Sequence, residues 1–238
     1  MEPFGEAGAD QLAAKEFAGR AFVLRVDDVA LETSTFVDDL VFMRQLGVRP
    51  IVVLDVAQRA SSERLVGLIN RVGGEAVALD GTSASTLVVA DDDEGRPVVR
   101  SVNAALLSLL LDQGYIPVFS AQGTLLSGRA EPLDPTDAAR ELAAAVHAKR
   151  LLYPSETNGI RTLGDGLIGE LTSSEALALA AAGTLSATAS KALEAAALGV
   201  RSGVDAAQLL DLSVAHAALV ELLTAQHLGT QVSSHVLI

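Results

Sequence analysis

The chain has 238 residues, half of them hydrophobic, and its 30 acidic residues outnumber 17 basic ones to give a formal net charge of −13. This length and apolar content suffice for a large core, whereas the charge argues against nucleic acid or an anionic membrane surface as a partner. The absence of cysteine excludes disulfides, thiolate nucleophiles and cysteine-ligated metals. Because residues 1–6 also lack a basic, apolar leader and no apolar run is long enough to span a bilayer, we expect a cytoplasmic protein.

The first part of the chain alternates short apolar runs with segments of helical period. Predicted strands cover residues 21–26, 51–54, 76–79, 86–90, 98–101, 116–120 and 150–153. Predicted helices cover residues 35–46, 61–72, 103–113 and 136–148. Strands that are apolar on both faces and alternate with helices predict an α/β fold, with a mostly parallel sheet covered by helices on both sides.

The second part of the chain is rich in alanine. Predicted helices at 174–182, 187–198 and 214–225 surround a short strand at 206–211, and a β segment follows at 230–238. Since no serine- or proline-rich linker separates the two parts, we expect one domain over residues 1–238, with an N-lobe at about 17–171 and a C-lobe at about 172–238. Residues 9–19 are helix-permissive, and they either pack on this domain or exchange with a partner subunit.

Two longer stretches, residues 36–54 and 102–119, share one pattern: an amphipathic helix, a glycine stop and a buried strand. Together with residues 69–79, they resemble the amino acid kinase superfamily, and most closely the acetylglutamate kinases. The resemblance runs with gaps over residues 17–232. It implies a three-layer αβα sandwich, an acyl-amino-acid half followed by an ATP half, and assembly into a homo-oligomer.

The residues that match the phosphate-binding groups of this family differ from them in charge and chemical type. Where the first strand of the family ends in a lysine and two glycines, this chain has Arg25 followed, after Val26, by Asp27 and Asp28. Where the second strand runs into a glycine triplet, this chain has Asp55 and no glycine. Carboxylates at these positions remove the close backbone approach and place negative charge beside the γ-phosphate. Since phosphoryl transfer depends on electrostatic stabilisation of the phosphate oxygens, the sequence predicts that transfer has been lost.

Other family positions depart in the same way. Residues 81–83 replace a glycine-lysine-aspartate turn, and Asp134 stands where an asparagine would bind the acyl amino acid. Glu156 conservatively replaces the aspartate that orients the catalytic lysines, whereas Thr188 replaces the second phosphate lysine. Lys191 lies one helical turn after Thr188, where it either substitutes for the missing lysine or is solvated.

One family pattern survives near the end of the chain. His216, Glu221, Gly229 and Thr230 match the positions that, in arginine-inhibited members of the family, build the feedback site for arginine. A guanidinium ligand requires a carboxylate and backbone carbonyls, which such a group could supply. The alternative is structural, with Glu221 on a helix surface and the glycine-threonine pair forming the turn before a strand.

Asp27, Asp28 and Asp55 also form a weak candidate for a cation site, because the carboxyl ends of neighbouring parallel strands meet at one edge of a sheet. Oxygen ligands alone would favour magnesium or calcium. The alternative is that these residues are solvated carboxylates in loops.

Three functions follow as hypotheses. The first is an acetylglutamate-kinase-like protein that has lost phosphoryl transfer and serves as a ligand-binding or regulatory subunit, with arginine or an acyl amino acid as ligand and no cofactor. The second is an active kinase that uses Mg-ATP, with Arg25 and Lys191 on the phosphate and Glu156 as their orienting group. The third is a structural partner subunit, which predicts no pocket deep enough for a small ligand.

Overall fold

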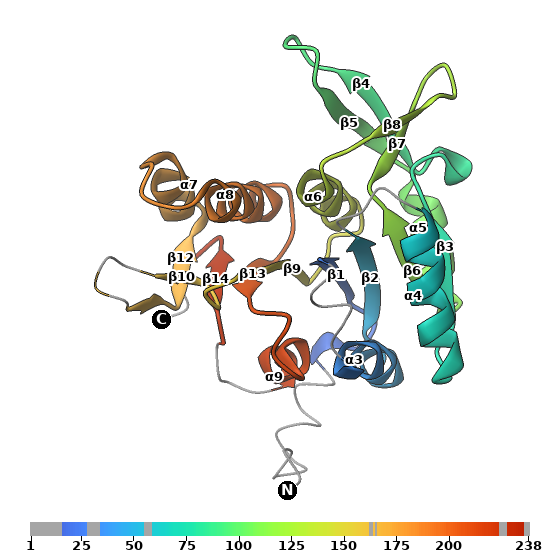
Figure 1. Ribbon diagram of the computed structural model, residues 1–238, viewed down its shortest axis with the longest axis horizontal. Coiled ribbons are helices and arrows are strands. Elements are labelled where there is room, and N and C mark those ends of the chain that lie inside the picture. The colour runs from blue at the N-terminus through green and yellow to red at the C-terminus, as the bar shows by residue number, and fades with distance from the viewer. Residues whose placement is uncertain are drawn as a thin grey trace, which may run out of the picture.

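The computed structural model describes residues 16–27, 34–54, 59–161, 164, 166–223 and 228–235 (Figure 1). Its centre is an eight-stranded sheet in which only one neighbouring pair, β13 with β14, is antiparallel. In spatial order its strands are β12 (Glu170–Thr172), β14 (Thr230–Ser233), β13 (Ala206–Leu210), β9 (Arg150–Pro154), β1 (Ala21–Val26), β2 (Arg49–Leu54), β6 (Ile116–Ser120) and β3 (Ala76–Leu79). The mostly parallel sheet predicted from the alternating pattern is therefore confirmed.

Helices cover both faces of this sheet, which gives three layers (Figure 1). The helices are α3 (Ser34–Gln45), α4 (Arg59–Arg71), α5 (Ala104–Asp112), α6 (Pro135–Ala145), α7 (Ser173–Ala181), α8 (Ala187–Arg201) and α9 (Ala217–Leu223). One apolar core joins α5, α6, α7 and α8 to the sheet, and the other joins α3, α4 and α9 to its opposite face.

Strand β1 shows how the sequence builds these layers. Successive side chains of a strand point to opposite faces, so Val23 joins the core beneath α6 and α8 while Phe22 and Leu24 join the core beneath α3. All three are almost completely buried. Full burial of an aliphatic or aromatic side chain contributes about 1.5–3 kcal/mol, so the apolar run that predicted this strand is also a main source of its stability.

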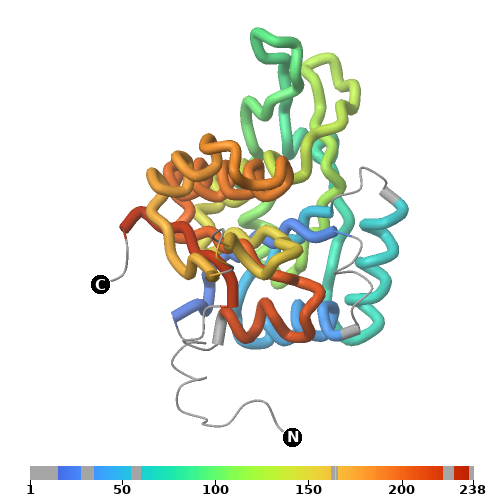
Figure 2. The backbone as a smooth tube through the Cα atoms, turned by 60° about the vertical axis from the view of Figure 1, so that its left-hand side comes forward, coloured from blue at the N-terminus to red at the C-terminus, as the bar shows by residue number. Residues whose placement is uncertain are grey.

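A second, four-stranded sheet projects from the rest of the molecule (Figures 1 and 2). It contains β5 (Pro97–Val102), β4 (Leu87–Asp91), β7 (Gln122–Leu125) and β8 (Ala130–Pro132). Its β4 and β5 correspond to the predicted strands 86–90 and 98–101, whereas β7 and β8 were not predicted. The segment between β6 and β8 contains glycine and polar residues, which weakens the strand signal in the sequence. A further short hairpin pairs β10 (Ile160–Arg161) with β11 (Leu167–Ile168).

Most of the predicted boundaries lie within one or two residues of those observed. The predicted helix 214–225 differs more, because α9 begins only at Ala217. His216, directly before it, has a left-handed backbone with φ 62°, which a continuing helix does not allow. The last strand ends at Ser233, and residues 236–238 lie outside the described part. Most of the predicted N-terminal helix also lies outside it.

Candidate functional site

A cavity of about 310 Å³ opens at the carboxyl ends of β1, β9 and β13, beside the N-terminus of α8. Strands β9, β1 and β13 are parallel neighbours, so the loops that follow them meet at one edge of the sheet. Its charged lining residues are Arg25, Asp27, Glu156 and Asp211. Its hydroxyl-bearing lining residues are Ser155, Thr157, Ser186, Thr188 and Ser213. Four positions singled out in the sequence, Arg25, Asp27, Glu156 and Thr188, are thus brought together.

The rim of the cavity is held by hydrogen bonds between its loops. The backbone N–H of Asp211 donates to the side-chain oxygen of Asn158 at 3.0 Å, which joins the loop after β13 to the loop after β9. The Asp211 carboxylate accepts from the backbone N–H of Ser213 at 2.9 Å and from its hydroxyl at 2.6 Å. The Asp211 carboxylate is therefore already oriented before any ligand arrives.

Helix α8 points its N-terminus at this cavity. Ser186 caps the helix by accepting a hydrogen bond from the backbone N–H of Ala189 at 3.2 Å. Thr188, which stands where the family has its second phosphate lysine, lines the cavity in the first turn. A helix N-terminus carries a partial positive charge that favours anionic groups. The first turn of α8 thus adds a partial positive potential to the cavity.

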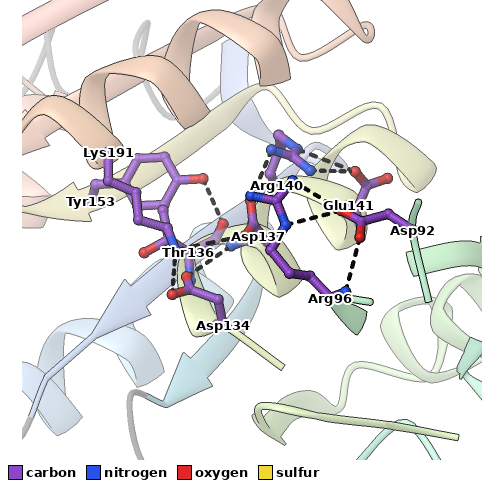
Figure 3. Close-up of polar contacts among 9 residues, drawn as sticks. All are labelled: Asp92, Arg96, Asp134, Thr136, Asp137, Arg140, Glu141, Tyr153 and Lys191. Carbon is purple, nitrogen blue, oxygen red and sulfur yellow. Dashed lines mark hydrogen bonds and ion pairs between the residues drawn. The ribbon is translucent and has the colours of Figure 1, made fainter. Parts of the chain in front are cut away.

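Lys191, one turn further along α8, is directed to a different partner (Figure 3). Its ammonium group forms an ion pair with the Asp134 carboxylate and lies 3.8 Å from that of Asp137, both at the start of α6. Asp134 also caps α6, because it accepts from the backbone N–H of Thr136 at 2.9 Å and of Asp137 at 3.4 Å. Burial acts to raise the pKa of Asp134, but Lys191 and these donors outweigh it and hold that pKa below its usual range. Lys191 is not among the residues that line the cavity.

The start of α6 is also held by a contact with strand β9 (Figure 3). Tyr153 of β9 is completely buried, and its hydroxyl donates to the Thr136 carbonyl at 3.0 Å. Burial raises the pKa of this phenol, so it remains a neutral donor. On the same helix, Arg140 pairs with Asp137 and Glu141, each at 2.9 Å. These contacts hold the first turn of α6, and Asp134 as its cap, in a fixed position beside Lys191.

Asp80, which follows the edge strand β3 and lies outside the cavity lining, is a well-bonded carboxylate that the sequence reasoning did not single out. Its carboxylate accepts from the backbone N–H groups of Thr82 at 2.9 Å and Ser83 at 3.1 Å, and also from both hydroxyls. Burial acts to raise the pKa of Asp80, but these hydrogen bonds lower it overall. The backbone N–H groups of this turn, which the sequence matches to the glycine-lysine-aspartate turn of the family, are thus already hydrogen-bonded to the Asp80 carboxylate. An aspartate just before Gly-Thr-Ser is the signal that could have indicated this closed turn.

The four residues matched to the arginine site lie outside the cavity lining: His216 directly precedes α9, Glu221 is on α9, Gly229 directly precedes β14 and Thr230 is its first residue. The His216 ring contacts the buried Asp39 carboxylate at 2.6 Å, and burial raises the pKa of Asp39 against the opposing effect of His216. Glu221 accepts from Gln208 and from the Leu228 backbone N–H. Arginine at this place would have to replace these contacts.

Gly229 and Thr230 have internal roles in the same region. A side chain at Gly229 would begin 2.0 Å from the Leu209 carbonyl, so only glycine fits. The Thr230 hydroxyl accepts from the Ile160 N–H at 2.7 Å and donates to the Ile168 carbonyl at 2.7 Å. Gly229 therefore lets the chain pass close to β13, and Thr230 ties the start of β14 to the β10–β11 hairpin. Arginine binding by this group stays a prediction.

Of the three candidate metal ligands, only Asp27 belongs to the described part of the chain, since Asp28 and Asp55 lie outside it. Within the described residues, no group of three or more acidic or histidine side chains is placed to hold a metal ion. The described helices also include none that is long and apolar enough to cross a membrane.

Comparison with known proteins identifies the family to which the chain belongs. Residues 29–204 match the model of the amino acid kinase family, and the chain belongs to that family. Within the family it is similar to acetylglutamate kinases. That of Synechococcus sp. (strain WH7803) is 29% identical over 265 residues, which cover 92% of this chain and 90% of the relative. That of Synechococcus sp. (strain RCC307) is 34% identical over 178 residues, covering 72% of this chain and 60% of the relative.

Solved structures agree on the fold. N-acetylglutamate synthase from Neisseria gonorrhoeae, in complex with coenzyme A and N-acetyl-glutamate, superposes with a TM-score of 0.84 at 20% identity. The match covers 96% of this chain but 63% of the synthase. A second structure of that synthase, with coenzyme A and L-arginine, gives a TM-score of 0.81 at 20% identity. These likenesses establish the amino acid kinase architecture for the chain.

Proposed function

We propose that this member of the amino acid kinase family does not transfer phosphate and instead binds a small amino-acid-like ligand as a regulatory subunit. The observation that carries the proposal is the charge of the cavity. Its lining holds the carboxylates of Asp27, Glu156 and Asp211 against the single guanidinium of Arg25. Counting only these described lining residues, the formal charge is −2.

This net negative charge disfavours the binding of a nucleoside triphosphate. Two like charges about 4 Å apart repel by about 4 kcal/mol near a protein surface, and ATP brings several negative charges to the cavity. Transfer of the γ-phosphoryl group also builds charge on the oxygens that a kinase must stabilise. A loss of several kcal/mol of that stabilisation corresponds to a rate reduction of many powers of ten, at about 1.4 kcal/mol for each tenfold.

The position of Lys191 supports the same conclusion. To reach a phosphate in the cavity, its ammonium would have to leave Asp134 and Asp137, which already neutralise it. The aspartates that follow the first two strands in the sequence, Asp28 and Asp55, add to the negative charge expected near this edge.

The ligand class follows from the family and from the presence of a cavity. Acetylglutamate kinases are similar to this chain over most of its length, and a fold relative was solved with N-acetyl-glutamate and with L-arginine. Arginine or an acyl amino acid is therefore the ligand we propose, in a homo-oligomer that acts near arginine metabolism. A purely structural subunit would have no need of the hydroxyl-rich cavity.

Two assays in parallel test this proposal. The first measures phosphoryl transfer from Mg-ATP to N-acetyl-L-glutamate by the full chain, with an active acetylglutamate kinase as a positive control. The second measures binding of Mg-ATP, L-arginine and N-acetyl-L-glutamate by calorimetry. We expect no transfer and binding of one amino-acid ligand; turnover above background would refute the proposal.

Reversing the substitutions provides a sharper version of the test. The variant that combines Asp27→Gly, Asp28→Gly and Asp55→Gly removes three carboxylates and restores glycine to the strand ends. We expect it to bind Mg-ATP more tightly than the unaltered protein, because both the repulsion and the steric block are relieved. Unchanged affinity for Mg-ATP would contradict our account of why transfer was lost.

A further inference from the structure

We infer that the cavity at the carboxyl ends of β1, β9 and β13 binds an amino acid with a cationic side chain. This deepens the proposed function, on which it rests, by choosing between the two ligand classes left open above. It also places the ligand in this cavity, which residues of both lobes line, and not at the group formed by His216, Glu221, Gly229 and Thr230.

The first argument is the distribution of charge over separate elements. Asp27 follows β1, Glu156 lies in the loop after β9, and Asp211 follows β13, so three carboxylates reach one cavity from three directions. The Asp211 carboxylate is held in place by Ser213. A guanidinium or ammonium group can be shared among such carboxylates through charge-assisted hydrogen bonds.

The second argument is the positive charge in the same lining. Arg25 is the only basic residue among the described lining residues, and the N-terminus of the 15-residue helix α8 adds a partial positive charge through Ser186 and Thr188. An α-carboxylate suits these groups. A ligand that carries both a carboxylate and a cation thus finds groups of opposite charge for each.

The third argument is size. A volume of about 310 Å³ lies at the lower limit of ligand pockets, which range over about 300–1,000 Å³. An amino acid fits this volume better than a nucleoside triphosphate. The five hydroxyl-bearing residues of the lining can serve as neutral donors or acceptors for the rest of the ligand.

Charge then decides between the two amino-acid classes. N-acetyl-L-glutamate carries two negative charges at neutral pH and has no cation, so it would add to a lining whose formal charge is already −2. L-Arginine carries one net positive charge and reduces that imbalance. L-Citrulline has nearly the same shape as arginine with no side-chain charge, which makes it the matched ligand for isolating the electrostatic contribution.

Calorimetry on the full chain in 0.15 M salt, an ionic strength that screens distant charges, tests the inference. The ligands are L-arginine, L-lysine, L-citrulline, N-acetyl-L-glutamate and Mg-ATP. We expect arginine or lysine to bind, and citrulline and N-acetyl-L-glutamate to bind at least about tenfold more weakly, the usual size of a lost charged hydrogen bond. Equal affinity for arginine and citrulline, or tighter binding of N-acetyl-L-glutamate, would overturn the inference while leaving the proposed function intact.

Three variants locate the site. Glu156 is exposed at the cavity, and Glu156→Gln should weaken arginine or lysine binding by about tenfold without changing the melting temperature. Glu194→Gln makes the same change on the exposed surface of α8, outside the lining, and should bind as the unaltered protein does. Loss of binding in Glu221→Gln but not in Glu156→Gln would move the ligand to the α9 group and refute the cavity assignment. Binding and turnover of Mg-ATP would instead refute the proposed function itself.

Discussion

The buried strands of the main sheet and the cavity at its carboxyl edge differ in how they relate to the acetylglutamate kinases. In the sheet, Val23, Leu24 and the residues Ile51–Leu54 are fully buried in two apolar cores, as the family architecture requires. At the edge, carboxylates and hydroxyls line a cavity at the strand ends where the sequence resemblance predicts the phosphate-binding residues of a kinase. Stability comes mainly from apolar burial, so the edge can change its chemistry while the fold persists.

The largest effect we expect comes from the sheet. Phe119 on β6 is fully buried in the core beneath α5 and α6. Phe119→Ala should lower the free energy of unfolding by about 3–5 kcal/mol, because it removes apolar contacts and leaves a cavity. Phe42→Ala, at a position that is 39% exposed, is the matched control and should cost much less in urea denaturation. Equal losses would mean that the two-core description is wrong.

The next effect concerns Gly229, which belongs to the sequence pattern of the arginine site. A Cβ there would lie 2.0 Å from the Leu209 carbonyl oxygen, so Gly229→Ala must displace backbone. We expect a loss of about 1–3 kcal/mol, the usual cost of overpacking. Gly67→Ala, on α4 with open space around it, should instead be neutral or stabilising by up to about 1 kcal/mol. A neutral Gly229→Ala, measured by thermal denaturation, would leave ligand binding as the reason for this glycine.

A smaller effect belongs to the turn at Asp80. Asp80→Asn removes the charge from an acceptor of four hydrogen bonds and should cost about 1.5–3 kcal/mol at neutral pH. Because folding lowers the pKa of Asp80, its charged form stabilises the protein above the unfolded pKa. That contribution is lost as the pH falls through the lower, folded pKa. Denaturation curves of the two proteins should therefore converge below about pH 4, and a constant difference down to the acid limit would contradict the assigned contacts.

The smallest effect on stability concerns Lys191. Its side chain is 46% exposed and that of Asp134 is 38% exposed, so solvent screens the pair and Lys191→Met should cost no more than about 1 kcal/mol. The variant should also leave Mg-ATP binding as weak as before, because we assign Lys191 to Asp134 and not to phosphate. A clear decrease in Mg-ATP affinity would instead assign Lys191 to the nucleotide.

The two regions also differ in how far the sequence predicted them. The apolar strands and amphipathic helices have local periodicity, so their order, and most of their boundaries to within two residues, followed from the sequence alone. The meeting of Arg25, Asp27 and Glu156 followed from the family order of strand ends. The pair formed by Lys191 and Asp134 did not, because these residues lie 57 positions apart and meet only when α8 packs beside α6. The hydrogen bonds from the Thr82 and Ser83 N–H groups to Asp80 could not be predicted either, because they depend on the backbone conformation of the turn.

Thermal denaturation of the full chain in excess Mg-ATP, with L-arginine in a parallel sample, tests the central claim most directly. A ligand at about 100 times its dissociation constant stabilises the folded state by about 2.7 kcal/mol, which gives a measurable rise in Tm. Our account predicts a rise with arginine and none with Mg-ATP. A rise with Mg-ATP and none with arginine would contradict it and would show that the cavity still serves a nucleotide.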